Sequence, residues 1–153
     1  MTKEDFYHDF LLIRQLRTPT SKKVRLLSEL MTEYENTWQV IGITEEALET
    51  FAKHNFNYVS RMGINRSHKV DRCVTYTELL TGELKSCDDW WNYFVENDKT
   101  ILATSSENKS NSLSRIIDID VSLGMFKSTG FKWRHNKAEK QMLHNLYNSN
   151  DTL

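Results

Sequence analysis

Apolar side chains recur every three or four positions near the start of the chain, the spacing that places them on one face of a helix. One such stripe runs from Phe6 to Leu16 and a second from Val24 to Tyr34. The only proline, Pro19, separates the two stripes, and proline interrupts helices because it lacks a backbone N–H. The pattern therefore predicts two N-terminal helices.

The next segment is predicted to contain a turn and a third helix. Gly42 is expected to mark the turn, and Thr44 is expected to cap the helix. Glu45 and Glu46 would lie in its first turn, where acidic side chains stabilise the positive end of a helix. Residues 1–55 are therefore interpreted as a helical part.

After residue 55 the pattern becomes mixed. Apolar and polar residues alternate over 64–70, which predicts an extended segment, and a short apolar strand is expected over 100–103. Two short helices are predicted between these strands. A Ser/Thr-rich turn then offers Ser105 or Ser106 as the cap of another helix, and the last helix is predicted over about 136–148.

These elements predict an α+β protein that is mainly helical, with a small antiparallel β-hairpin and an N-terminal helical subdomain. Residues 1–153 are expected to form a single domain, because domains of roughly 100–200 residues are typical. Its parts would be the helical N-terminal part (1–55), a mixed core with a helical insertion (56–115) and a C-terminal extension (116–153).

Composition narrows the classes of protein that fit. No apolar run approaches the roughly 20 residues needed to cross a bilayer, and the acidic N-terminus lacks the pattern of a signal peptide. Cys73 and Cys87 are the only cysteines, and they form neither a CxxC motif nor a disulfide framework. A cytoplasmic protein without a membrane partner is therefore predicted.

The net charge of −1 argues against a general nucleic-acid binder. The charges are nevertheless uneven, since residues 53–72 and 127–140 are both predominantly basic. Two explanations stay open. Each basic stretch could form a phosphate-binding face, or each could be an ordinary solvated surface.

Two segments carry the candidate chemistry. The sequence contains no Walker loop, GxGxxG, GxSxG or HExxH motif, and no zinc-type Cys/His spacing. What remains is INRSHKVDR over 64–72 and TILATSSENKSN over 100–111. The first places a histidine in an extended cationic segment, and the second places an asparagine at a helix start. A histidine can activate water beside a phosphodiester, and oxygen ligands can hold a hard cation.

These segments resemble the HNH (ββα-metal) nuclease family, through SHKVDR over 67–72 and ILATSSENK over 101–109. The resemblance covers residues 64–111 only. It implies a ββα-metal-like core and a metal-dependent endonuclease that hydrolyses DNA phosphodiester bonds with Mg²⁺ or another divalent cation. Ser67 departs from the Asp, Asn or His usual before the histidine. Lys99 stands where the family keeps its middle asparagine, next to Asn97 and Asp98.

The resemblance also implies roles for single residues. His68 would be the general base, since the ordinary pKa of histidine, near 6.5, suits proton transfer at neutral pH. Asn108 would bind the metal, together with Ser67, Asp71 or Asn65. The candidate nucleic-acid contacts are basic side chains that would hold backbone phosphates: Arg66, Lys69, Arg72, Lys109, Lys132 and Arg134.

Two other functions fit the same sequence. The neutral Ser67 favours a non-catalytic nucleic-acid-binding or regulatory protein, such as one from a phage or mobile element. The near-neutral net charge favours a protein-interaction module that uses the N-terminal helices. DNA is the expected partner, although the sequence does not distinguish DNA from RNA, and a homo-oligomer stays open.

Overall fold

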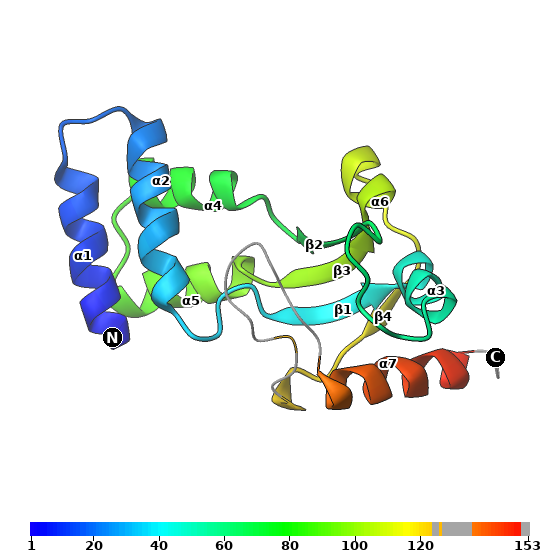
Figure 1. Ribbon diagram of the computed structural model, residues 1–153. Coiled ribbons are helices and arrows are strands. Elements are labelled where there is room, and N and C mark those ends of the chain that lie inside the picture. Colours follow the sequence, from blue (N-terminus) through cyan, green and yellow to red (C-terminus); the bar gives the residue numbers. More distant parts are fainter. Residues whose placement is uncertain (124–125, 127–135, 151–153) are drawn as a thin grey trace. The chain divides into compact units, whose positions relative to one another are not determined.

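The computed structural model describes residues 1–123, 126 and 136–150 (Figure 1). Lys132 and Arg134, two of the predicted nucleic-acid contacts, lie outside the described residues. The chain divides into two compact units, each built from two segments. The helical unit comprises Met1–Thr37 and His68–Lys99, and the sheet unit comprises Trp38–Ser67 and the residues from Thr100 onward.

The described residues form seven α-helices, two short 3-10 helices and four strands. The helical unit contains α1 (Lys3–Gln15), α2 (Thr20–Leu30), η1 (Met31–Glu33), α4 (Arg72–Thr81) and α5 (Cys87–Asn97). The sheet unit contains β1 (Val40–Thr44), α3 (Glu45–Lys53), β2 (Ile64–His68, whose last residue belongs to the helical unit), β3 (Thr100–Thr104), α6 (Ser105–Ser110), β4 (Ile116–Asp118), η2 (Val121–Leu123) and α7 (Lys137–Asn150).

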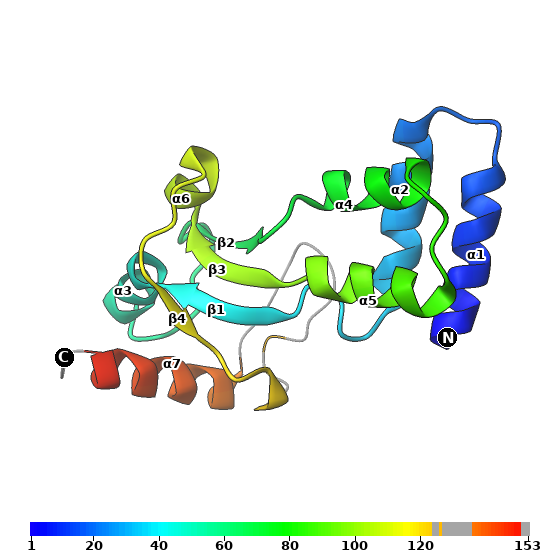
Figure 2. The ribbon, with the colours of Figure 1, turned by 180° about the vertical axis from the view of Figure 1, so that it is seen from behind.

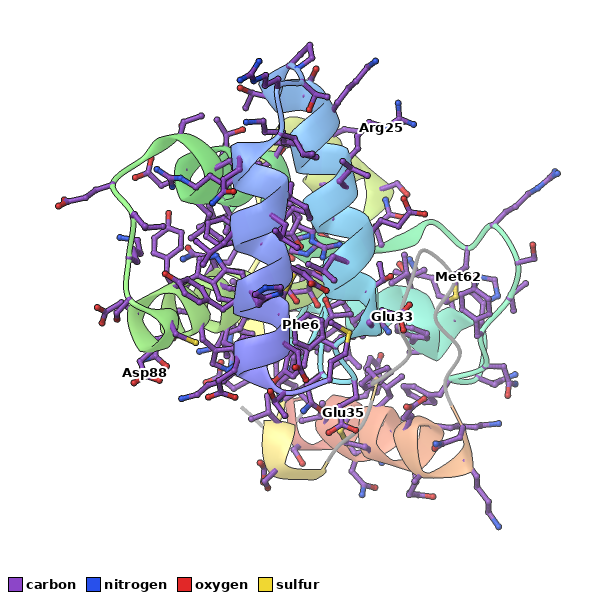
Figure 3. The ribbon with its side chains drawn as sticks, turned by 90° about the vertical axis from the view of Figure 1, so that its left-hand side faces the viewer. Phe6, Arg25, Glu33, Glu35, Met62 and Asp88 are labelled. Carbon is purple, nitrogen blue, oxygen red and sulfur yellow. The ribbon has the colours of Figure 1, made fainter. Side chains whose placement is uncertain are left out.

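An aromatic core holds the helical unit together. Phe6 and Phe10 of α1 are buried, as their spacing predicts, and the ring of Phe10 lies 5.0 Å from the ring of Trp90 on α5. Figure 3 shows α1 and α2 side by side, with Phe6 on α1 and the exposed Arg25 on α2. The helical insertion expected inside the mixed core, residues 73–98, therefore belongs to segment 68–99, which packs with the N-terminal helices.

The sheet has four strands in the order β2-β3-β1-β4. β1 runs parallel to β3 and antiparallel to β4, and Figure 2 shows β4 beside β1. The backbone N–H of Ser105 donates to Gly63, and that of Lys69 donates to Lys99, so β2 and β3 run in opposite directions. The α+β class is confirmed. The simple β-hairpin is wrong, because its two strands belong to a mixed sheet completed by β1 and β4.

Gly42 shows why the sequence pattern did not predict strands β1 and β4. It was expected to mark a turn, which is wrong, because it lies inside β1. A Cβ atom at this position would stand 2.9 Å from Cγ2 of Ile116 and 3.2 Å from the carbonyl oxygen of Ile117. Glycine is therefore the residue that lets β4 approach β1 closely. The apolar pattern alone does not reveal this non-local contact.

The interior of the sheet unit is apolar. Ile43 of β1 and Leu102 of β3 are fully buried, together with Phe51 of α3 and Leu143 of α7. In the described part of the chain, no helix is long and apolar enough to cross a membrane.

A buried carboxylate, Glu107, ties three segments of the sheet unit together. It accepts hydrogen bonds from the Thr104 N–H (2.8 Å), the Thr44 hydroxyl (2.8 Å) and the Ser114 N–H (2.8 Å) and hydroxyl (2.6 Å). Thr104 and Glu107 form a capping box, so the cap of α6 is Thr104 and not Ser105 or Ser106. Burial alone would raise the pKa of Glu107, but these hydrogen bonds outweigh it and lower the pKa to about 2.

We expect Glu107 to stabilise the protein above pH 4.5 and to lose this effect in acid. Because the pKa in the folded state is about 2 and the ordinary value is 4.5, the stabilisation is lost as the pH falls from 4.5 toward 2. Glu107→Gln should lower the free energy of unfolding at pH 7 by about 2–3 kcal/mol. Urea denaturation across this pH range measures the effect. The exposed Glu29→Gln serves as the control, and equal losses in both variants would contradict the prediction.

Candidate functional site

His68 and Asp98 lie next to each other in the helical unit. His68 is the last residue of β2, and its side chain is 11% exposed. Asp98 is the C-cap residue of α5, and its side chain is 6% exposed. The Nε2 atom of His68 lies 3.6 Å from Oδ1 of Asp98. The ends of a strand and a helix thus place an imidazole beside a largely buried carboxylate.

The Asp98 carboxylate has two further partners. The buried Thr37 hydroxyl donates a hydrogen bond of 2.8 Å to its Oδ2, and Nε of Arg72 lies 3.3 Å from its Oδ1. Arg72 opens α4 and also donates to the hydroxyl of Tyr76, one turn further along this helix. We call these five residues, Thr37, His68, Arg72, Tyr76 and Asp98, the histidine–aspartate cluster.

Charge inside this cluster is nearly balanced. Arg72 carries one positive charge, and its guanidinium carbon lies 5.0 Å from the centre of the Tyr76 ring. Burial raises the pKa of Tyr76 above its ordinary value, so its hydroxyl stays protonated and neutral at physiological pH. Asp98 supplies the compensating negative charge. A positive charge on His68 would therefore be stabilised by the Asp98 carboxylate, which also pairs with Arg72.

This geometry permits a specific chemistry at His68. If Nε2 carries a proton directed at Asp98, then Nδ1 is the nitrogen that can accept another proton. A carboxylate beside an imidazole fixes its tautomer and stabilises the imidazolium ion that forms on proton transfer. The cluster could therefore support general-base catalysis at His68.

Arg66 occupies a different environment. It is 9% exposed and lies in the sheet unit, where its guanidinium donates to the carbonyl oxygen of Phe126 at 3.0 Å. Burial lowers the pKa of Arg66 to about 10, partly offset by the charge of Glu139. Glu139 in turn accepts a hydrogen bond from the Phe126 N–H at 2.7 Å. Arg66 thus fixes the chain at Phe126, and its guanidinium is directed at protein atoms.

The other predicted basic contacts divide by exposure. Lys69 and Lys109 are exposed, whereas the side chain of Arg72 is only 13% exposed and lies in the histidine–aspartate cluster. Lys69 and Lys109 are therefore the described candidates best placed to meet a phosphate in solvent. Each of the two units contributes one of them.

The predicted metal ligands belong to different units. Asp71 belongs to the helical unit and caps α4, where its Oδ1 accepts a hydrogen bond of 2.7 Å from the Cys73 N–H. Ser67 and the exposed Asn108 belong to the sheet unit. Among the described residues, no group of three or more His, Cys, Asp and Glu side chains could hold a metal ion. Binding of Mg²⁺ by Asn108 with Ser67 or Asp71 therefore stays a prediction.

Sequence reasoning identified His68 but missed Asp98, which lies beside it, and Thr37, which donates a hydrogen bond to Asp98. Asp98 was assigned no role, although it directly precedes Lys99, the position at which the HNH family keeps its middle asparagine. The position of Asp98 beside Lys99 was the signal in the sequence that could have identified it. Thr37 gave no signal, because it lies 61 residues from Asp98 in the sequence.

Comparison with known proteins adds no family assignment. No protein-family model matches the chain, and no curated protein or solved structure matches it. The resemblance to HNH nucleases over residues 64–111 and the pairing of His68 with Asn108 therefore stay predictions.

The histidine–aspartate cluster is expected to be a coupled unit. Asp98→Asn should lower the free energy of unfolding by about 3 kcal/mol, because it leaves the charge of Arg72 uncompensated in a largely buried position. Combining it with Arg72→Met removes that charge as well. The double variant should therefore lose at least about 1 kcal/mol less than the sum of the two single variants. Urea denaturation of all four proteins tests this coupling, and additive losses would contradict it.

Proposed function

We propose that this protein hydrolyses DNA phosphodiester bonds with His68 as the general base. The supporting observation is the 3.6 Å separation between Nε2 of His68 and Oδ1 of Asp98. A histidine oriented by a carboxylate is a recurrent arrangement for removing a proton from an attacking oxygen. The resemblance of residues 64–111 to HNH nucleases independently assigns the same histidine this role.

The proposed hydrolysis uses two side chains of the helical unit, His68 and Asp98. The imidazole of His68 takes a proton from water while the water oxygen forms a bond to phosphorus. The bond from phosphorus to the leaving oxygen then breaks, and that oxygen is protonated by the imidazolium or by solvent. Asp98 stabilises the imidazolium between these events. A divalent cation, where one is required, would neutralise charge on the phosphate.

His68→Ala should abolish nicking of supercoiled plasmid DNA. General-base catalysis typically contributes about 10²–10⁴-fold to a rate, so the remaining activity should be at least about 100-fold lower. Asp98→Asn should give an intermediate rate, because it keeps the shape of the side chain but removes the charge that stabilises the imidazolium. His8→Ala, at an exposed position of α1, is the matched control and should leave the rate unchanged.

The assay requires Mg²⁺, Mn²⁺ and EDTA conditions in parallel. Circular dichroism of each variant separates a loss of catalysis from a loss of folding. Wild-type protein that leaves the plasmid intact under every condition, or His68→Ala protein that nicks it as rapidly as wild type, would refute the proposal.

A second candidate is a non-catalytic nucleic-acid-binding or regulatory protein. Two observations favour it: Asp71 uses its carboxylate to cap α4, and Ser67 offers only a neutral hydroxyl. The exposed Lys69 and Lys109 could still contact phosphates. Such contacts position a protein on nucleic acid without requiring chemistry.

Binding of duplex DNA in this second case should be sensitive to salt and insensitive to EDTA. Lys69→Ala and Lys109→Ala should each reduce the slope of log K against log salt by about 1, because each contact releases counterions. Lys22→Ala, at an exposed position of α2, should leave the slope unchanged. Fluorescence anisotropy with a labelled duplex measures these slopes. A loss of binding on chelation would count against this candidate.

A further inference from the structure

The sheet unit contains a groove lined by residues of α3, by Asn55 and Phe56 just beyond it, and by residues of α7. These two helices pack against each other (Figure 1). The groove consists of two adjoining pockets of about 450 and 460 Å³, both lined by Phe56 and His144. These volumes fall within the range of roughly 300–1,000 Å³ that is typical of small-molecule sites. We call this feature the α3–α7 groove.

The wall of the groove is aromatic and is set by an unusual backbone. Asn55 and Phe56 both have positive φ angles, 52° and 56°, which side-chain-bearing residues seldom adopt. This conformation ends α3, where the Phe56 N–H donates to the carbonyl oxygen of Phe51 at 2.8 Å. It places the Phe56 ring 5.1 Å from His144 and 5.7 Å from Tyr147, both on α7. Strained backbone of this kind is concentrated at functional sites.

The rim of the groove is cationic. Lys137 and Lys140 line one pocket, while Lys53 and Glu49 line the other. Among the lining residues that the structure describes, three lysines against one glutamate give a net charge of +2 when His144 is neutral. Nζ of Lys140 also donates a hydrogen bond of 2.8 Å to Asn57, which holds this ammonium group near the end of α3. An anionic ligand is therefore electrostatically favoured.

Polar groups for hydrogen bonding complete the lining. Gln141 and Asn55 present amides to the pocket that contains Lys137. The side-chain nitrogen of Asn148 lies 3.2 Å from Nδ1 of His144. If the Asn148 amide donates to this nitrogen, the neutral imidazole carries its proton on Nε2 and can act as a donor. The groove thus combines amides and cations with the rings of the exposed His144 and the half-buried Tyr147, whereas Phe56 is only 9% exposed.

We propose that the α3–α7 groove binds a nucleoside monophosphate unit, either as a free nucleotide or at the end of a nucleic-acid strand. Aromatic side chains bind nucleobases by stacking, and lysines bind phosphate as point charges. A simple anion would make no use of the aromatic wall, and an apolar ligand would leave the lysines without partners. This inference goes beyond the proposed hydrolysis, because it uses the sheet unit alone and none of the histidine–aspartate cluster.

Isothermal titration calorimetry of the full chain tests the proposal. The ligands are AMP, inorganic phosphate and a short single-stranded oligonucleotide. AMP or the oligonucleotide should bind with a Kd between about 1 μM and 1 mM, and inorganic phosphate at least about 10-fold more weakly. Tighter binding of AMP would identify a free nucleotide as the ligand, whereas tighter binding of the oligonucleotide would identify a strand end.

Two groove variants and one control locate the site. Lys137→Glu and His144→Ala should each raise the Kd by about 10-fold or more, whereas the exposed Lys22→Glu in the helical unit should not. Lys137 is the first residue of α7, where an acidic side chain is compatible with the helix, so folding should be retained. His144 is exposed, which makes its replacement equally tolerable.

The proposal is overturned if neither AMP nor the oligonucleotide binds at about 10 mM, if phosphate binds as tightly as AMP, or if Lys22→Glu weakens binding as much as Lys137→Glu. His68→Ala should bind AMP like the wild type. This comparison separates a failure of the groove from a failure of the proposed hydrolysis.

Discussion

The Asp98 carboxylate links the two chain segments that form the helical unit. The unit consists of two chain segments, Met1–Thr37 and His68–Lys99. Asp98 accepts a hydrogen bond from Thr37, at the end of the first segment, and lies within ion-pair distance of His68 and Arg72, at the start of the second. Asp98 itself stands near the end of the second segment. The chain leaves this unit after Thr37, enters it again at His68 and leaves it after Lys99. The largely buried carboxylate of Asp98 lies close to all three of these positions.

The structural role of Asp98 limits the chemistry that it can support. Removing a carboxylate and a guanidinium from water is costly, and close contact with hydrogen bonding offsets this cost. Arg72 already compensates the charge of Asp98, because its Nε lies 3.3 Å from Oδ1 of the carboxylate. In a proton transfer, Asp98 would orient the imidazole as well as stabilise the imidazolium ion. Orientation of a general base is itself a substantial part of catalysis.

Local and non-local features differ in how well the sequence predicts them. The helices of the N-terminal part follow from apolar spacing, and the capping box of Thr2 with Asp5 forms within four consecutive residues. The strand at Gly42 does not follow, because the need for glycine arises from Ile116 and Ile117, more than 70 residues away. His68 was identifiable as a candidate from its neighbours in the sequence. Its contact with Asp98 depends on folding that brings the ends of β2 and α5 together.

The two basic stretches of the sequence are distributed differently in the folded protein than their order along the chain suggests. The basic stretch over 53–72 does not form one face, because Arg66 is buried at Phe126 and Arg72 is paired with Asp98. Lys53, at the start of this stretch, instead lines the α3–α7 groove, as do Lys137 and Lys140 from the second basic stretch. Cations from both stretches therefore meet beside the aromatic wall of Phe56 and α7. The sequence left two explanations open for the basic stretches: a phosphate-binding face or an ordinary solvated surface. The groove fits a phosphate-binding face better than the stretch around His68 does, because Arg66 and Arg72 already have protein partners.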